Sequence, residues 1–151
     1  MKKFLAIICA ATLIFAGCGE NSKATSAEIK EEIPVKNSIT IQVNGKNFSA
    51  TLEDNPTARA FEKIIPLELD MTELNGNEKY FYLAKNLPSN SVSVNQIHSG
   101  DLMLFGSNCL VLFYKDFTTS YSYTRLGKID NPADLENILG INNVLVKFSK
   151  N

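Results

Sequence analysis

The chain has little of the chemistry on which most enzyme sites depend. Among its 151 residues there are one histidine, three cysteines and no tryptophan. Zinc centres combine several histidine, cysteine or carboxylate ligands, and a sequence so poor in histidine and cysteine does not supply such a cluster. A glycine-rich phosphate loop is also missing. We therefore expect no metal and no cofactor.

The charge is nearly balanced, with 15 lysines and arginines against 16 acidic residues and a formal net charge of −1. Proteins that bind nucleic acid carry a basic patch or stripe, and no such cluster is present here. Nucleic acid is therefore not an expected partner. Arginine is scarce, since Arg59 and Arg125 are the only two in the chain.

The first residues have the pattern of an export signal. A basic start, Met1-Lys2-Lys3, precedes 13 uncharged and mostly apolar residues, Phe4 to Ala16. This run is shorter than the roughly 20 residues that a transmembrane helix needs, and it is typical of a signal peptide. The stretch "FAGC" that follows resembles the lipobox of bacterial lipoproteins, with Phe15 where leucine is usual. The resemblance implies removal of residues 1–17 and lipid attachment to Cys18.

Under this interpretation the protein is anchored by lipid to a bacterial membrane of the cell envelope, with its domain outside the cytoplasm. Two or three acyl chains would give stable anchoring, which a single chain does not. The alternative is an ordinary secretory signal that leaves Cys18 free. In the lipoprotein case Cys9 leaves with the signal and Cys109 has no disulfide partner. Cys109 lies in the apolar run "NCLVLFY" and is expected to be a buried core residue, because a nucleophilic cysteine would need a base and exposure.

The composition then changes twice along the chain. Residues 18–37 are polar and charged and have little to bury, which predicts a flexible tether. Apolar and polar residues alternate from Ser38 onward, as in "SITIQVN" and "NFSATL", which indicates half-buried strands. Asn44-Gly45 between these two segments favours a hairpin turn. About eight such strands and two short helices predict a mainly β domain, a closed barrel, over residues 38–151.

Two segments, "NPTARAFEKIIP" and "NPADLENILG", have the pattern of short helices. In the first, Asp54 or Asn55 can cap the helix, and Pro66 ends it. The residues expected on its apolar stripe are Ala58, Phe61, Ile64 and Ile65. Arg59 lies off this stripe, so it should point to solvent. In the second segment we expect Asn131 to cap the helix and Gly140 to follow its end.

A candidate ligand groove is predicted from one strand. Tyr121, Tyr123 and Arg125 alternate along "SYSYTRLGKI", and Phe117 is nearby. Aromatic rings beside a guanidinium could line a groove for a peptide or small molecule. The alternative is a cross-strand aromatic ladder with Arg125 stacked over it. His98, the sole histidine, is a candidate for the same groove or an ordinary loop residue; its neighbours in "HSGD" are too close in sequence to form a catalytic triad.

Several segments together resemble the bacterial cyclophilin-like domain proteins. The resemblance extends from about Ile39 to Phe148, and the segments that carry it are "DNPTARAFEKIIPLELDM", "GDLMLFG", "LVLFYKDF" and "SYSYTRLGKI". It implies an eight-stranded barrel with a helix at each end. The true cyclophilins, which are peptidyl-prolyl isomerases, are more distantly similar, and their Thr-Ala-x-x-Phe motif corresponds to Thr57-Ala58-Arg59-Ala60-Phe61. This resemblance implies that Phe61 packs into one end of the barrel.

The resemblance does not include the isomerase site. Cyclophilins stabilise the twisted prolyl bond with an arginine from the strand after this helix, but here no arginine occurs between Ala60 and Gly100. Lysine does not reproduce the planar fork of arginine. We therefore expect a non-catalytic module that binds a peptide or small ligand. The alternatives are a prolyl isomerase of the cell envelope with a substituted active site and a purely structural interaction module.

Overall fold

The computed structural model describes residues 37–151, which form eleven strands and two helices. The expected signal peptide, Cys18 and all of the tether except Asn37 lie outside the described residues. The strands are β1 (Ser38–Val43), β2 (Lys46–Leu52), β3 (Leu67–Leu74), β4 (Glu78–Tyr82), β5 (Val92–Ser93), β6 (Gln96–Ile97), β7 (Asp101–Phe105), β8 (Cys109–Phe113), β9 (Phe117–Thr118), β10 (Ser122–Ile129) and β11 (Val144–Lys150). The helices are α1 (Pro56–Ile64) and α2 (Leu135–Leu139).

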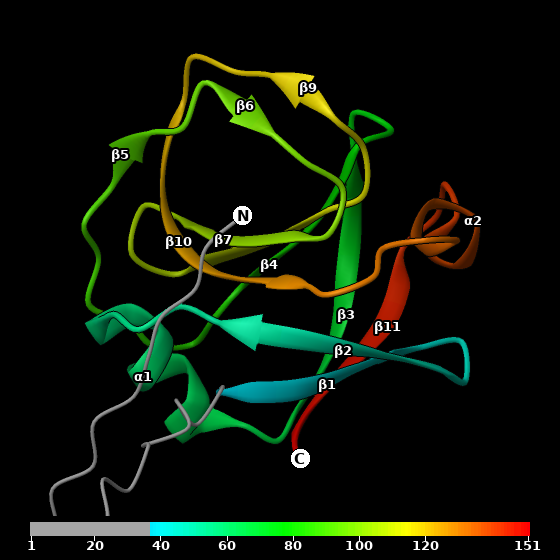
Figure 1. Ribbon diagram of the computed structural model, residues 1–151, viewed down its shortest axis with the longest axis horizontal. Helices are drawn as coiled ribbons and strands as arrows, with labels where there is room; N and C mark the ends of the chain where they lie inside the picture. The colour runs from blue at the N-terminus through cyan, green and yellow to red at the C-terminus, as the bar shows by residue number, and fades with distance from the viewer. Residues whose placement is uncertain (1–36) are drawn as a thin grey trace, which may run out of the picture. The chain divides into compact units, whose positions relative to one another are not determined.

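Eight strands close into an antiparallel barrel, as the sequence predicted. Their order is β2-β1-β11-β3-β4-β8-β7-β10, and β10 pairs again with β2 to complete the circle. The β1–β2 hairpin turns at Asn44 and Gly45, which both have positive φ, as the turn requires. Three short strands stand outside the circle: β5 extends the edge at β10, and β6 pairs only with β9 (Figure 1).

The seam that closes the barrel depends on Gly127. Residues 127–129 of β10 pair with residues 50–52 of β2. A Cβ atom at Gly127 would lie 2.4 Å from the carbonyl oxygen of Thr51, well inside van der Waals contact. The absence of a side chain at Gly127 therefore lets the first and last strands of the circle approach closely enough to pair.

Strands β7 and β8 are covered on both faces, which explains their unbroken apolar sequences. Alternate residues face the barrel interior, where they belong to the main core: Leu102, Leu104, Leu110 and Leu112. The residues between them join a second, smaller core on the outer face: Met103, Cys109, Val111 and Phe113, packed with Ile97 and Tyr123. The β6–β9 pair supplies part of the cover over this second core, through Ile97 and Phe117.

Helix α1 forms largely as expected. Asn55 is its N-cap, and its side-chain oxygen accepts a hydrogen bond of 2.8 Å from the amide of Ala58. Phe61 is fully buried and meets Phe148 of β11 edge to face, with ring centroids 5.6 Å apart. Ile64 departs from the prediction, because its side chain is 37% exposed. The helix ends there, so Ile64 lies at the rim of the stripe while Ile65 turns into the core.

Helix α2 is shorter than the sequence predicted, since it begins at Leu135. Asn131 does not cap it; its side chain accepts a hydrogen bond from the amide of Ala133 and forms a local turn instead. Asp134 has a φ of 64°, and this left-handed residue separates the turn from the helix. Gly140 follows the helix end as expected, also at positive φ. In Figure 1 the two helices lie on opposite sides of the barrel.

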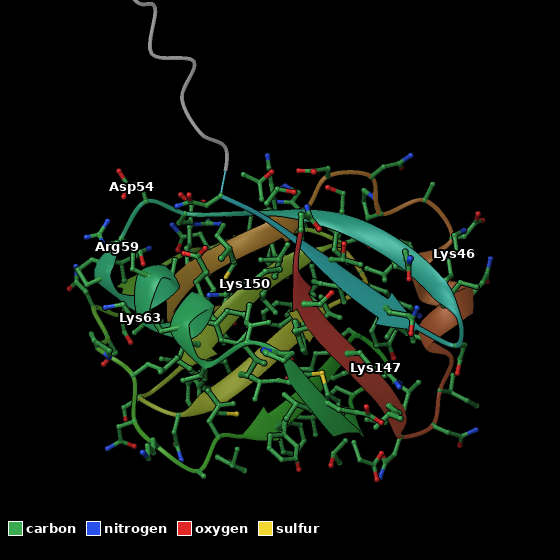
Figure 2. The ribbon with its side chains drawn as sticks, turned by 90° about the horizontal axis from the view of Figure 1, so that it is seen from below. Lys46, Asp54, Arg59, Lys63, Lys147 and Lys150 are labelled. Atoms are coloured by element: carbon green, nitrogen blue, oxygen red, sulfur yellow. The ribbon has the colours of Figure 1, made fainter. Side chains whose placement is uncertain are left out.

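Arg59 is an exposed charge of α1, as its spacing predicted. Its guanidinium forms an ion pair with Asp54, and both side chains are at least half exposed (Figure 2). Such surface pairs contribute about 0–1 kcal/mol to stability. Arg59 is therefore a surface residue at the N-terminal end of the helix.

A buried lysine ties the turn after α2 to the barrel. The side chain of Lys79 is fully buried, and its ammonium donates to the carboxylate of Glu73 and to the carbonyls of Gly140 and Asn142, each carbonyl at 2.7 Å. The hydroxyl of Tyr114 donates to the same carboxylate, at 2.9 and 3.0 Å from its two oxygens. Burial alone would raise the pKa of Glu73, but these hydrogen bonds and that from the Gly76 amide outweigh it and lower the pKa.

The helices described in residues 37–151 include none that is long and apolar enough to cross a membrane.

Candidate functional site

An open cleft of about 520 Å³ lies against the outer face of the barrel, beside the second core. Its lining residues come from β4, β7, β8 and β10, from the end of β3 and the turn after it, and from residues 117–121. Among residues 37–151, fifteen line it: Leu74, Asn75, Asn77, Glu78, Tyr80, Tyr82, Phe105, Cys109, Val111, Phe117, Thr118, Thr119, Ser120, Tyr121 and Tyr123. We call it the aromatic cleft, because six of these side chains are tyrosine or phenylalanine.

The strand pattern explains why aromatic rings gather here. Tyr80 and Tyr82 alternate along β4, so both point to the outer face, and their ring centroids are 5.7 Å apart. A second group of rings, from β7 and β10 and their flanking residues, forms a connected series. Phe105 contacts both Tyr121 and Tyr123, at 6.0 and 5.6 Å between centroids. The Tyr80–Tyr82 and Phe105–Tyr121 pairs meet edge to face, and the Phe105–Tyr123 pair is tilted, both of which are favoured arrangements of aromatic rings.

Two of the polar groups that line the cleft are acceptors with unusual environments. Glu78 is half-buried at the start of β4, and burial together with the nearby charge of Glu73 raises its pKa to about 7. The side-chain oxygen of Asn77 is buried and accepts no hydrogen bond within residues 37–151. Both groups present acceptor oxygens. The aromatic cleft therefore combines apolar rings with a half-buried carboxyl group and a buried amide oxygen that accepts no hydrogen bond from the described residues.

The thiol of Cys109 lies in this cleft but is not activated. Burial raises its pKa, and the charge of Glu78 raises it further, against a smaller opposing effect of the Tyr82 hydroxyl. A thiolate nucleophile requires the opposite shift, which nearby cations provide in reactive cysteines. The expectation that Cys109 is a buried core residue is confirmed, since its side chain is 6% exposed.

The five residues of the predicted groove do not meet in one place. Phe117, Tyr121 and Tyr123 line the aromatic cleft. Arg125 instead lines a separate hollow of about 340 Å³, between the start of α1 and residues 88–92. It lies two residues beyond Tyr123, about 7 Å further along the strand, where a different segment covers the sheet.

His98 lies in neither hollow. Its imidazole is largely exposed, and its Nδ1 is 3.9 Å from a carboxylate oxygen of Asp101. That same carboxylate accepts a hydrogen bond of 2.9 Å from the His98 amide, which is the arrangement of a turn before β7. His98 is therefore placed as a loop residue, the alternative that the sequence left open.

The rings on and beside the tyrosine strand contact one another, and Arg125 lies apart from them. The rings do form an aromatic series, because Phe113 packs against both Tyr123 and Phe117 at 5.5 and 5.7 Å. However, Arg125 is not stacked over any ring among the cation–π contacts of the described residues. One end of the series, at Tyr121, is exposed, and this end forms the rim of the aromatic cleft.

Sequence reasoning missed the β4 side of the cleft. Tyr80, Tyr82 and Glu78 line it together with Phe105. The alternation in "EKYFYLA" was a sufficient signal that two tyrosines share one face of the strand. It did not indicate which other segments would line a cleft with them. Of the described residues, no group of three or more histidine, cysteine or acidic side chains could hold a metal ion.

Comparisons with known proteins agree with this architecture. A solution structure of a hypothetical protein from Archaeoglobus fulgidus is similar to the chain, with a TM-score of 0.55 and 17% sequence identity over 80% of this chain and 99% of that one. At this identity the similarity concerns the fold alone. A search of curated proteins gave no match. Residues 41–149 match the sequence profile described as the cyclophilin-like family, and this match covers most of the chain. The chain therefore belongs to the cyclophilin-like family.

Proposed function

We propose that this protein is a non-catalytic binding module whose ligand site is the aromatic cleft, and that lipid on Cys18 anchors it to a bacterial membrane. The observation that carries the proposal is the cleft itself. It is open, its volume of about 520 Å³ is within the usual range for small-molecule sites, and rings line it around a few polar groups. A peptide side chain or a small molecule would fit such a site.

The chemistry of the cleft favours binding over catalysis. Its thiol has a raised pKa, and the two arginines of the chain lie elsewhere, on α1 and beside the smaller hollow. Rotation about a prolyl bond is promoted by a fixed donor or charge at the proline nitrogen. The walls of the aromatic cleft contain no arginine or lysine to act as that donor.

The frame of the cleft suits reversible binding. Paired strands of the barrel hold Tyr80, Phe105 and Tyr123. Residues 119–121, which also line the cleft, lie outside the strands, and Tyr121 is 63% exposed. A ligand would therefore meet a preorganised side and a side that can adjust, and preorganisation reduces the entropy lost on binding.

A titration of residues 37–151 with a library of small soluble fragments tests the proposed site. In ¹H–¹⁵N correlation spectra the perturbed amides should cluster around the aromatic cleft. Phe105→Ala should weaken binding of the responding fragments about tenfold, because the lost ring contributes roughly 1–1.5 kcal/mol. The matched control is Ile141→Ala, which removes an apolar side chain that is 80% exposed and lies outside the cleft. Perturbations that cluster elsewhere, or equal effects of the two variants, would contradict the assignment.

The anchoring is tested separately. Cys18→Ser should move the full-length protein from the membrane fraction to the soluble fraction of a bacterial lysate, because the acceptor of the lipid is gone. The same change should abolish incorporation of labelled palmitate. Continued membrane association of the variant after a high-salt wash would contradict lipid anchoring through Cys18.

A further inference from the structure

The aromatic cleft has a marked asymmetry of charge. Its lining includes six aromatic rings, namely those of Tyr80, Tyr82, Phe105, Phe117, Tyr121 and Tyr123. It includes one carboxyl group, that of Glu78, and neither lysine nor arginine. The faces of aromatic rings carry negative potential and attract cations, and ammonium groups without N–H donors are recognised by cages of such rings.

Within the part of the chain that the structure describes, the carboxyl group of Glu78 forms no ion pair. Lys79 is next in sequence, but alternation along β4 directs it into the barrel, where Glu73 and two backbone carbonyls occupy its ammonium. A half-buried carboxylate of this kind is stabilised when a positive charge binds beside it.

The buried oxygen of Asn77 adds a second acceptor at the same place. It lines the cleft and receives no hydrogen bond from the described residues. A buried acceptor without a donor is costly, and a ligand hydroxyl or N–H group could supply one if the Asn77 side chain turned toward the cleft. The cleft thus offers negative potential and acceptors, but no cationic side chain of its own.

We propose that the aromatic cleft binds a small organic ammonium ion, with its alkylated head among the tyrosine and phenylalanine rings and its charge beside Glu78. This deepens the proposed function by naming the ligand class, and it rests on the same cleft. A neutral aromatic ligand would use the rings but would gain nothing from Glu78. An anionic ligand would be repelled by Glu78 and by the ring faces.

Binding of a permanent cation should depend on pH. The pKa of Glu78 is about 7 in the free protein, so the carboxyl group becomes fully charged only above neutral pH. The titratable groups whose charges interact with it include Glu73 on β3, Cys109 and Tyr114 at β8, and Tyr123 on β10. Lys79 of β4 is next in sequence, and Tyr80, Tyr82 and Tyr121 line the same cleft. Glu73 has a lowered pKa, and Cys109, Tyr114 and Tyr123 have raised ones. Affinity should therefore rise between about pH 6 and pH 8 through Glu78.

Choline and its neutral isostere 3,3-dimethyl-1-butanol provide a matched pair of probes. They have the same shape and hydroxyl group and differ in the charge of the head. Titration of residues 37–151, followed by NMR shifts of the tyrosine ring protons, should give an affinity for choline at pH 8 at least about tenfold above that for the isostere. Glu78→Gln should remove most of this difference and the pH dependence, and should leave the affinity for the isostere unchanged.

The control variant is Glu68→Gln, which removes an exposed carboxylate of β3 outside the cleft and should change neither affinity. Equal affinities for the two probes would overturn the inference, and so would a choline affinity that Glu78→Gln does not alter. In either case the cleft would still bind a ligand, as proposed above, but the charge of that ligand would play no part. Binding of neither probe in the cleft would also overturn it. The fragment titration then decides independently whether the cleft binds any ligand.

Discussion

Replacing Lys79 with methionine should destabilise the domain by about 3–5 kcal/mol, measured by urea unfolding at pH 7. Methionine fills most of the space, so the loss is electrostatic. The carboxylate of Glu73, only 17% exposed, would lose its cation, and the carbonyls of Gly140 and Asn142 would lose their donor. Removing one partner of a buried ion pair costs more than the pair contributed, because an uncompensated charge remains.

Two comparisons make this prediction specific. Lys147→Met removes a half-exposed lysine paired with Glu68 and should cost less than about 1 kcal/mol. Adding Glu73→Gln to Lys79→Met should restore part of the stability, because the buried charge is then gone. The single variant should also lose less stability at acid pH, where Glu73 is protonated. A Lys79→Met domain as stable as the parent would show that the network contributes little.

Replacing Gly127 with alanine should open the seam of the barrel and cost about 2–3 kcal/mol or more. The new Cβ would stand 2.4 Å from the carbonyl oxygen of Thr51 and 3.0 Å from the Cα of Leu52. Both are backbone atoms of β2, so no side-chain rotation can relieve the contact. The strands would have to separate, and amide hydrogen exchange should rise most at the paired residues 50–52 and 127–129.

Lys128→Ala is the matched control for the seam. Lys128 is the next residue of β10, pairs with Thr51 and points to solvent. Its replacement should leave both stability and exchange close to those of the parent domain. If Gly127→Ala behaved like this control, the β2–β10 pairing would not be the tight closure that the structure describes.

Most of the fold could be predicted from the sequence because its signals are local. The alternation of apolar and polar residues predicted the strands, and Asn44-Gly45 predicted the hairpin. The unbroken apolar runs predicted strands covered on both faces. Closure of the barrel depends on the pairing of β2 with β10, which are far apart in sequence. The prediction of a closed barrel therefore rested on the number of strands and on the family resemblance. The start of α2 was misplaced because the side chain of Asn131 caps a local turn and Asp134 is left-handed.

The candidate site was predicted less well, for a physical reason. A cleft is formed where segments from different parts of the chain meet, and the sequence does not show that register. Tyr121, Tyr123 and Phe117 were found because they lie close together along the chain. The lining residues Tyr80, Tyr82 and Glu78 of β4 were not found, and Arg125 was grouped with the tyrosines although a different segment covers it. The raised pKa of Glu78 arises from burial beside Glu73, which only the folded structure reveals.

The central claim is that this cyclophilin-like barrel acts by binding and not by catalysis, and the rate of prolyl isomerisation tests it most directly. The measurement is the cis/trans exchange rate of a proline-containing test peptide, followed by NMR exchange spectroscopy with residues 37–151 added. We predict that the peptide exchanges at its uncatalysed rate in the presence of the parent domain, and that the rate is the same when the Arg125→Ala variant is added. Acceleration of the exchange by the parent domain that is lost in Arg125→Ala would contradict the account and assign the chain to the isomerases.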